Sequence, residues 1–279
     1  MIQSKASDLA YMINNKVFVV GNGPSLRHFD LSTIDMYDWV GMNAAYRHWD
    51  RIGIYPKFYS CLDLNVGVSH IQEIIRLVKD SKINKIKLFL LRDNIISSSK
   101  LLKESSIVIN YDKEFTSFPD RIKKQVTTGS HTLLWMHLLG FKQIILLGID
   151  INYKELADGS TFIGKKKNHT LKITKNEVSK NYFFDDYQEK GDVYSVPNPI
   201  PNLHKNSWSR MINYIRFIDE NVSIFNGSSI SEMKDVDYLD IGKFLSNKKV
   251  SIKKYVSKRN IKIDNQMEFY SKSYKPKFE

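Results

Sequence analysis

The chain has 279 residues, of which 42% are hydrophobic and 26% are charged. This composition is that of a globular protein, and it excludes a disordered, collagen-like or coiled-coil chain. The single cysteine, Cys61, excludes an internal disulfide and any metal site that needs several cysteines. No apolar run reaches the ~20 residues of a membrane-spanning helix, and residues 1–15 lack the apolar core of a signal peptide. We therefore expect a cytoplasmic protein.

The formal net charge is +12, and much of it lies at the C-terminus, where residues 241–279 hold eleven lysines and arginines against three acids. Such a segment is either a solvated tail or a surface for anionic partners. The charge alone makes a nucleic-acid-binding protein the non-enzyme alternative. Residues 1–240 show no basic stripe interleaved with aromatic residues, however, so we expect no nucleic-acid partner. Acidic glycans and an anionic membrane surface both stay open as partners. Binding to the membrane would be a peripheral, salt-sensitive association with the inner face of the cytoplasmic membrane. The sequence leaves homo-oligomerisation open.

Short apolar runs alternate with helical patterns along the chain. The first run, Lys16–Val20, ends at a glycine turn, as a buried strand does. Alternation of this kind predicts an α/β fold with a doubly wound, mostly parallel sheet covered on both faces. The further predicted strands are 39–42, 58–62, 86–91, 106–110, 143–147 and 222–225, and the clearest predicted helices are 68–78, 131–139 and 208–218.

A long segment with weak periodicity, residues 151–206, interrupts this alternation and is called the insertion below. It directly follows a predicted strand, and ligands of open α/β sheets bind at the carboxyl ends of the strands. We therefore expect a lid or acceptor-binding segment over a site. The predicted organisation is a Rossmann-like catalytic domain over 1–240, which includes the insertion, and a basic segment over 241–279.

Two motifs sit where predicted strands and helices meet. The first, Gly21–Leu26 (GNGPSL), can turn backbone amides toward a phosphate, although a bare tight turn fits as well. It is neither a P-loop nor a dinucleotide fingerprint, because the lysine and the third glycine are absent. The second, Thr127–Ser130 (TTGS), opens a helix. Either Thr128 or Ser130 caps that helix, or its free N–H groups bind an anion.

Two titratable residues stand out near these motifs. Asp150 ends a buried strand, where it can hold a ribose, a metal or a backbone amide. His204 lies at the end of the insertion, just before a helix, and an unperturbed imidazole can accept a proton at neutral pH. The nearest approaches to an acidic metal site are Asp63-Leu64-Asn65 and Asp185-Asp186, which are more typical of solvated loops.

Taken in order, these segments resemble the bacterial sialyltransferases of glycosyltransferase family 42. The resemblance starts at 19–26, continues at Gly41-Met42-Asn43, is strongest over 127–150 and resumes at His204. It implies a single Rossmann-like, GT-A-like domain with a lid. It also implies inverting transfer of sialic acid from CMP-sialic acid to a sugar hydroxyl of a surface glycan, such as lipooligosaccharide or capsule, without a metal.

The resemblance also implies roles for individual residues. His204 matches the general base that takes the proton of the acceptor hydroxyl. Tyrosines of the lid donate to the departing phosphate, and the sequence does not choose between Tyr153, Tyr182, Tyr187 and Tyr194. The residues implied to hold the nucleotide and the donor sugar are Asn22, Gly23, Pro24, Ser25, Asn43, Thr128, Gly129, Ser130 and Asp150.

Other donors and activities stay open. The family has an Asn after its third strand, where this chain reads Tyr59–Asp63 (YSCLD), so another CMP-linked acidic sugar such as Kdo, legionaminic or pseudaminic acid fits too. The chain more distantly resembles the DUF115 proteins, which share the GxGPSL loop and include flagellin nonulosonate transferases and a pterin diphosphokinase. A diphosphokinase needs Mg²⁺ and acidic ligands, which are sparse here.

Overall fold

The strands of the main sheet are apolar on both faces, and the fold follows from the need to cover both. The computed structural model describes residues 15–151, 156, 159–163, 170–176, 180–196 and 202–246. Eight strands form a parallel sheet in the order β11-β10-β6-β1-β2-β3-β4-β5. Their bounds are β1 Lys16–Val20, β2 Asp38–Met42, β3 Phe58–Cys61, β4 Leu88–Leu91, β5 Val108–Asn110, β6 Gln143–Leu147, β10 Ser223–Asn226 and β11 Asp237–Tyr238.

Alternate residues of each strand enter two separate cores, because side chains of a strand point to opposite faces. In β1, Val17 and Val19 pack on one face, whereas Phe18 and Val20 pack on the other. The helices on the first face are α8 Tyr111–Glu114, α9 Asp120–Lys123, α10 Thr128–Leu138 and α11 Leu203–Ile218. The second face holds α2 Tyr46–Ile52, α3 Leu64–Ser69, α4 Ile71–Lys79, α6 Asp93–Ser97, α7 Lys100–Glu104 and α12 Ile241–Ser246, and α5 Ser81–Asn84 follows α4.

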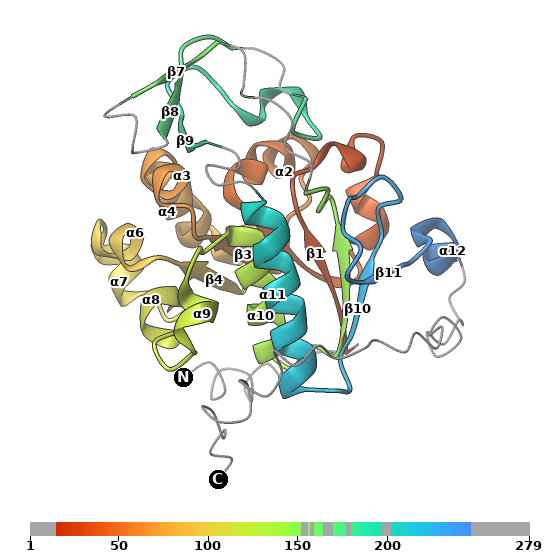
Figure 1. The fold of residues 1–279 in the computed structure, drawn as a ribbon. Coiled ribbons are helices and arrows are strands. Elements are labelled where there is room, and N and C mark those ends of the chain that lie inside the picture. The colour runs from red at the N-terminus through yellow and green to blue at the C-terminus, as the bar shows by residue number, and fades with distance from the viewer. Residues whose placement is uncertain are drawn as a thin grey trace.

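The strand order reverses between β1 and β6. Strands β1 to β5 run outward on one side, and the chain then returns to place β6 on the other side of β1. Such a reversal leaves a crevice at the carboxyl ends of the two strands, because their connections leave in opposite directions. In Figure 1 the insertion lies over this end of the sheet.

Helix α10 has no solvent-exposed face between Ser130 and His137. Its residues from Ser130 to His137 are buried, because the helix lies between the sheet and α11 (Figure 1). Gly129 allows the two helices to approach, since a Cβ there would lie 2.8 Å from the ring of Trp208. The N-terminus of α10 is thereby held directly against the first turns of α11.

The predicted doubly wound sheet is confirmed, with differences in two helical regions. The single helix predicted over 68–78 is two helices, because the backbone of His70 is not helical (φ −104°, ψ 21°) and separates α3 from α4. Its buried ring bonds the Tyr46 hydroxyl through Nδ1 at 2.7 Å. The helix predicted over 208–218 begins earlier, at Leu203, so the last four residues of the insertion form its first turn.

The insertion contains regular structure that its weak periodicity did not predict. Three strands, β7 Ser160–Phe162, β8 Thr170–Ile173 and β9 Val193–Ser195, form an antiparallel sheet with Leu171 opposite Tyr194. Both of these residues are buried. Because each strand has only three or four residues, the sequence pattern is too short to reveal a period of two.

The basic segment begins as part of the packed fold. Ile241 of α12 is buried, and Phe244 and Leu245 pack against the core on the same face. Residues 247–279, with most of the predicted basic segment, lie outside the described residues. No helix in the described part of the chain combines the length and the apolar character needed to cross a bilayer.

The approach of the loop after β1 to the end of β6 gives a test of the fold. A Cβ on Gly21 would overlap the carbonyl oxygen of Gly148 and the Ile149 side chain. We expect Gly21→Ala to lower the free energy of unfolding by about 1–3 kcal/mol, as overpacking does. Gly53→Asn is the control, since Gly53 is left-handed (φ +68°) in open space, and it should cost less than ~1 kcal/mol. The free energy of unfolding is measured by urea denaturation, and an equal loss in the two variants would contradict this packing.

Candidate active site

A cavity of about 940 Å³ opens at the carboxyl ends of the central strands, under the insertion. The loops after β1, β2, β3 and β6 line it together with the N-termini of α10 and α11. Of the predicted site residues, the cavity brings together Asn22, Gly23, Pro24, Asn43, Thr128, Gly129, Asp150, Tyr182, Tyr187, Tyr194 and His204. Ser25 and Ser130 do not line it, and Tyr153 lies outside the described residues.

The GNGPSL loop is fixed by backbone contacts with the end of β6. Gly21 N donates to Leu147 O at 2.7 Å, and Gly23 N donates to Gly148 O at 2.9 Å. Asp150 completes the contact, because its Oδ2 accepts from Ser25 N at 2.8 Å. The sequence left three roles open for Asp150, namely binding a ribose, a metal or a backbone amide. The structure shows the last of these, because the carboxylate accepts a hydrogen bond from a backbone amide. Ser25 takes part through its backbone and not as a cavity-lining side chain.

Two asparagines that line the cavity have side-chain amide oxygens with no hydrogen-bond partner among the described residues. Asn22 Nδ2 donates to Met42 O at 3.3 Å and to the Tyr187 hydroxyl at 3.1 Å, while Oδ1 of Asn22 and of Asn43 are buried and unpaired among the described residues. Asn43 also adopts a left-handed backbone conformation (φ +55°), which is sparsely populated outside glycine. Buried unpaired acceptors are unfavourable. A ligand that offers hydroxyl or amino groups would satisfy them.

The described tyrosines of the insertion differ in what their hydroxyls do. The rings of Tyr182 and Tyr187 stack with centroids 3.8 Å apart. The Tyr187 hydroxyl accepts from Asn22, so this pair lies over the GNGPSL loop. The Tyr194 hydroxyl instead donates to Tyr187 O at 2.9 Å and lies 3.2 Å from Asp192 Oδ2. Tyr194 therefore supports the insertion from within, and burial raises its pKa.

The side chains of the TTGS motif do not cap α10, contrary to the prediction that Thr128 or Ser130 would do so. Thr127 is the N-cap residue of α10, and no side chain caps the helix. Thr128 is the first helical residue, and its Oγ1 accepts from Leu62 N at 3.2 Å, which ties α10 to the end of β3. Ser130 is fully buried behind the cavity, where it bonds Thr127 Oγ1 and Ser207 Oγ, each at 2.7 Å. Ser130 thus links α10 to α11 and does not line the cavity.

His204 lies in the first turn of α11, half-buried at the cavity wall. Ser207, which follows one turn later, carries the bond to Ser130, so the position of His204 relative to α10 is fixed by a buried contact. Burial lowers the pKa of His204 to about 4. The imidazole is therefore neutral at pH 7 and able to accept a proton.

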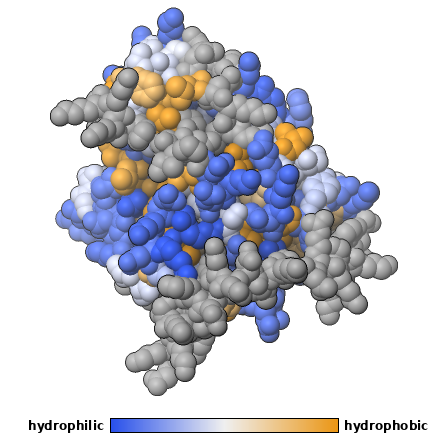
Figure 2. Space-filling view, viewed as in Figure 1, coloured by the Kyte–Doolittle hydropathy of each residue, from blue (hydrophilic) through white to orange (hydrophobic). Residues whose placement is uncertain are grey.

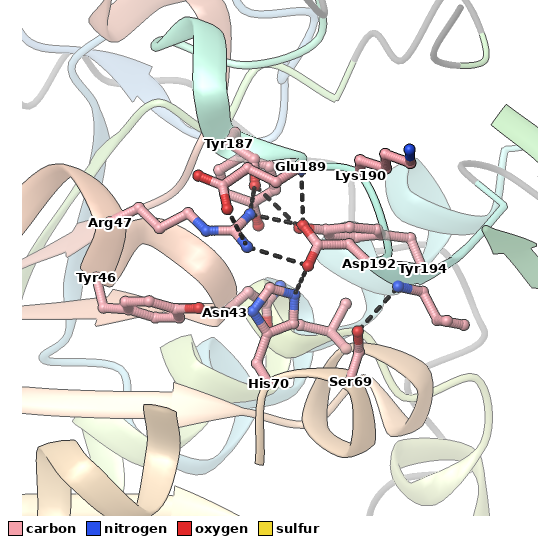
Figure 3. A network of polar contacts seen from close by, with 12 residues as sticks. Asn43, Tyr46, Arg47, Ser69, His70, Tyr187, Glu189, Lys190, Asp192 and Tyr194 are labelled. Atoms are coloured by element: carbon pink, nitrogen blue, oxygen red, sulfur yellow. Dashed lines mark hydrogen bonds and ion pairs between the residues drawn. The ribbon is translucent and has the colours of Figure 1, made fainter. Parts of the chain in front are cut away.

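The insertion is held to the domain by a buried ion pair, shown in Figure 3. Arg47 Nη1 and Nη2 bond the two carboxylate oxygens of Asp192 at 2.6 and 3.0 Å. Arg47 also donates to Tyr187 O at 2.8 Å and lies 3.2 Å from Glu189 Oε2. Burial raises the pKa of Asp192, but the hydrogen bonds from Arg47 and from Glu189 N, together with the charges of His70 and Arg47, outweigh it, so this pKa lies below the usual value. The pair is charged at neutral pH and places Tyr187 over the cavity.

A second set of contacts joins the insertion to α3. Asp63 caps α3 by accepting from Asn65 N at 2.9 Å, and it also accepts from Ser195 Oγ at 3.0 Å. Asn65 Nδ2 donates to the same Ser195 hydroxyl at 2.9 Å. Asp185 and Asp186 pair with arginines, Arg27 at 3.6 Å and Arg51 at 2.7 Å. In the described ranges, no three His, Cys, Asp or Glu side chains gather as metal ligands do.

Sequence reasoning missed several residues that line the cavity. Arg92 follows β4, and Lys123 ends α9, and neither belongs to a recognisable motif. The position of Arg92 directly after a strand was a usable signal, because strand ends point into the site. Asp63 and Asn65 were considered only as metal ligands, and they too line the cavity. The other missed polar residues are Gln125, Thr170, Lys180, Asn181 and Ser195.

Two buried histidines, His70 and His131, and the half-buried His204 give the protein a predictable acid response. Burial lowers the pKa of His70, His131 and His204 to about 4, from 6.5. Below pH 6.5 these histidines bind protons in the unfolded chain but stay neutral in the folded chain. The free energy of unfolding is therefore highest above pH 6.5 and falls as the pH drops toward 4. We expect Tm to fall steadily from pH 7 to pH 5, with a shallower slope in His131→Asn. A constant Tm over this range would contradict the burial of these rings.

No protein-family model and no curated protein matches the chain. Several solved structures do match it. The sialyltransferase CstII from Campylobacter jejuni, in complex with the substrate analogue CMP-3FNeuAc, superposes with a TM-score of 0.50 and 18% identity over 80% of this chain and 85% of that one. The α-2,3-sialyltransferase Cst-I from the same organism gives 0.51 and 15% over 92% of each chain. The expected resemblance is therefore confirmed at the level of fold, and the chain has the α/β fold of these bacterial sialyltransferases.

Proposed function

We propose that the protein is an inverting glycosyltransferase that moves sialic acid, or a related acidic sugar, from a CMP-activated donor to a hydroxyl of a surface glycan such as lipooligosaccharide or capsule. One observation carries this proposal. A single cavity at the strand-order reversal holds a neutral histidine, unpaired asparagine oxygens, a tyrosine pair and a helix N-terminus. The fold shared with CstII, which was solved with CMP-3FNeuAc, supports the same donor class.

The nucleotide half of the donor lies at the loops after β1 and β2. The Oδ1 atoms of Asn22 and Asn43 are acceptors that ribose hydroxyls or the cytosine amino group can satisfy. The tyrosine pair, Tyr182 and Tyr187, lies next to Asn22 and supplies phenolic groups for the phosphate. We assign the phosphate to this pair and not to Tyr194, whose hydroxyl is committed to Tyr187 O.

The donor carboxylate fits the N-terminus of α10. The first N–H groups of an α-helix have no partner within the helix, and its dipole favours an anion there. Thr128 and Gly129 line the cavity at this point, and no acidic residue lies in the first turn of α10. The sugar ring would then lie between the tyrosine pair and His204.

In the reaction, His204 takes the proton from the acceptor hydroxyl while that oxygen attacks the anomeric carbon. The bond from this carbon to the phosphate oxygen breaks, and CMP departs with the electron pair. The anomeric centre passes through an oxocarbenium-like state and inverts, as expected for a single displacement. Because the leaving phosphate is already a weak base, hydrogen-bond donors aimed at it suffice to stabilise its charge. The mechanism assigns no step to a metal.

Substitution of His204 tests this assignment. We expect His204→Ala to lower kcat for transfer from CMP-sialic acid to a galactoside by about 10²–10⁴-fold, the usual contribution of a general base. Binding of CMP should survive, because the nucleotide half of the cavity is intact. His28→Ala, at an exposed histidine, is the matched control. Transfer at the wild-type rate in His204→Ala would remove the residue from the mechanism.

A further inference from the structure

A buried pair of serines joins α10 to α11. Ser130 and Ser207 are fully buried, and their Oγ atoms lie 2.7 Å apart, whereas Ser207 Oγ lies 3.4 Å from both Gln125 O and Thr127 Oγ1. The other buried residues of α11 are hydrophobic, namely Trp208, Met211, Ile212, Tyr214 and Ile215. A buried hydroxyl is costly unless it is hydrogen-bonded, and a satisfied polar contact within an apolar interface favours one arrangement of the helices.

The direction of this hydrogen bond follows from the buried ring of His131. Burial lowers the pKa of His131 to about 4, so the ring is neutral at pH 7 and only one nitrogen carries a hydrogen. We assign this hydrogen to Nε2, because Nε2 lies 2.9 Å from Ile122 O and Nδ1 lies 3.1 Å from Thr127 O. Nδ1 then accepts from Ser130 Oγ at 3.2 Å, and Ser130 Oγ accepts from Ser207 Oγ. A continuous set of hydrogen bonds thus runs from α11 through α10 to α9.

The first turn of α11 begins without a side-chain cap. Its N-cap residue, Asn202, has a left-handed backbone (φ +58°), and its side chain caps no N–H group of the helix. Such a cap ordinarily stabilises the first turn. Lys205 and Asn206 are exposed, and Figure 2 shows hydrophilic side chains gathered over the face that carries α9 and α11. Ser207 therefore supplies a buried hydrogen bond that holds the start of α11 against the domain.

The serine contact lies directly behind the proposed reaction centre. His204 precedes Ser207 by three residues, so their side chains lie on the same side of α11. His204 lines the cavity together with Thr128 and Gly129, which lie at the N-terminus of α10. Ser130 follows these two residues in the same turn of α10. The proposed base and the proposed carboxylate position are therefore carried by two helix ends that meet at the Ser130–Ser207 bond.

We infer that Ser207, with Ser130 as its partner, is a positioning residue that sets the distance between the His204 imidazole and the donor sugar. This inference rests on the proposed function, in which the donor carboxylate binds at the N-terminus of α10. The carboxylate fixes the sugar and its anomeric carbon relative to α10, whereas the base belongs to α11. A displacement of about 1 Å between a catalytic group and the reacting atoms can lower a rate by ~10²-fold. The serine bond prevents such a displacement without contacting the substrate, since neither serine lines the cavity.

The test compares Ser207→Ala and Ser130→Ala with the wild type. It measures the single-turnover rate of transfer from CMP-sialic acid to a lactoside, or to water where the lactoside is not used. We expect each variant to be about tenfold slower or more, with the Kd for CMP changed by less than about twofold, because the nucleotide half of the cavity is intact. Both serines act through one bond, so the double variant should be no slower than the slower single variant. Ser207→Cys, which keeps the side-chain size with a weaker donor, replaces Ser207→Ala if that variant does not fold.

Thr132→Val is the matched control for the loss of a buried hydroxyl. Thr132 is also fully buried in α10, but its hydroxyl donates to Thr128 O at 2.7 Å within the same helix. We expect this variant to lower Tm as the serine variants do and to leave the transfer rate within about twofold. Serine variants with a lower Tm and an unchanged rate would overturn the positioning role and leave the proposed function standing. If the wild type neither transfers from CMP-sialic acid nor hydrolyses it, the proposed function fails, and the positioning role fails with it.

Discussion

The site depends on one close backbone contact, where the loop after β1 meets the end of β6. Gly21 and Gly23 donate to the carbonyls of Leu147 and Gly148, and no side chain fits between these segments. The contact lies where the strand order reverses, so it places the GNGPSL loop at the crevice that open α/β sheets offer to ligands. Asp150 then holds the next turn of the loop through Ser25 N. The other parts of the cavity are assembled around this fixed loop.

The second half of the site comes from the insertion, which must be held in place from outside its own small sheet. The Arg47–Asp192 pair does this on one side, and the contacts of Asp63 and Asn65 with Ser195 do it on the other. Pairs of this kind are strong when both charges are partly buried and hydrogen-bonded, and costly when one partner is lost. The pair therefore couples the position of the tyrosine pair to the folded domain, and the cavity is complete only when the insertion is docked.

Local patterns predicted the sheet well, because buried parallel strands are continuous apolar runs that end at glycine or asparagine. The prediction of β6 over 143–147 agrees with the structure residue by residue. Features set by tertiary contacts were not predictable in this way. The break at His70 depends on a buried bond to Tyr46, and Ser130 bonds Ser207, 77 positions later in the chain. Arg92 lay outside every motif, since its place in the cavity wall follows from which strands are neighbours and not from local sequence.

The most direct test of the account is equilibrium binding of nucleotides by isothermal titration calorimetry, with CMP, UMP and ATP, each with EDTA and with Mg²⁺. We predict saturable 1:1 binding of CMP that is the same in EDTA and in Mg²⁺, at least tenfold tighter than binding of UMP, and weakened in Asn22→Ala. Binding of ATP that requires Mg²⁺, with none of CMP, would contradict the account and favour a phosphotransferase of the diphosphokinase type. Equal affinity for UMP and CMP would contradict the assignment of a CMP-linked donor.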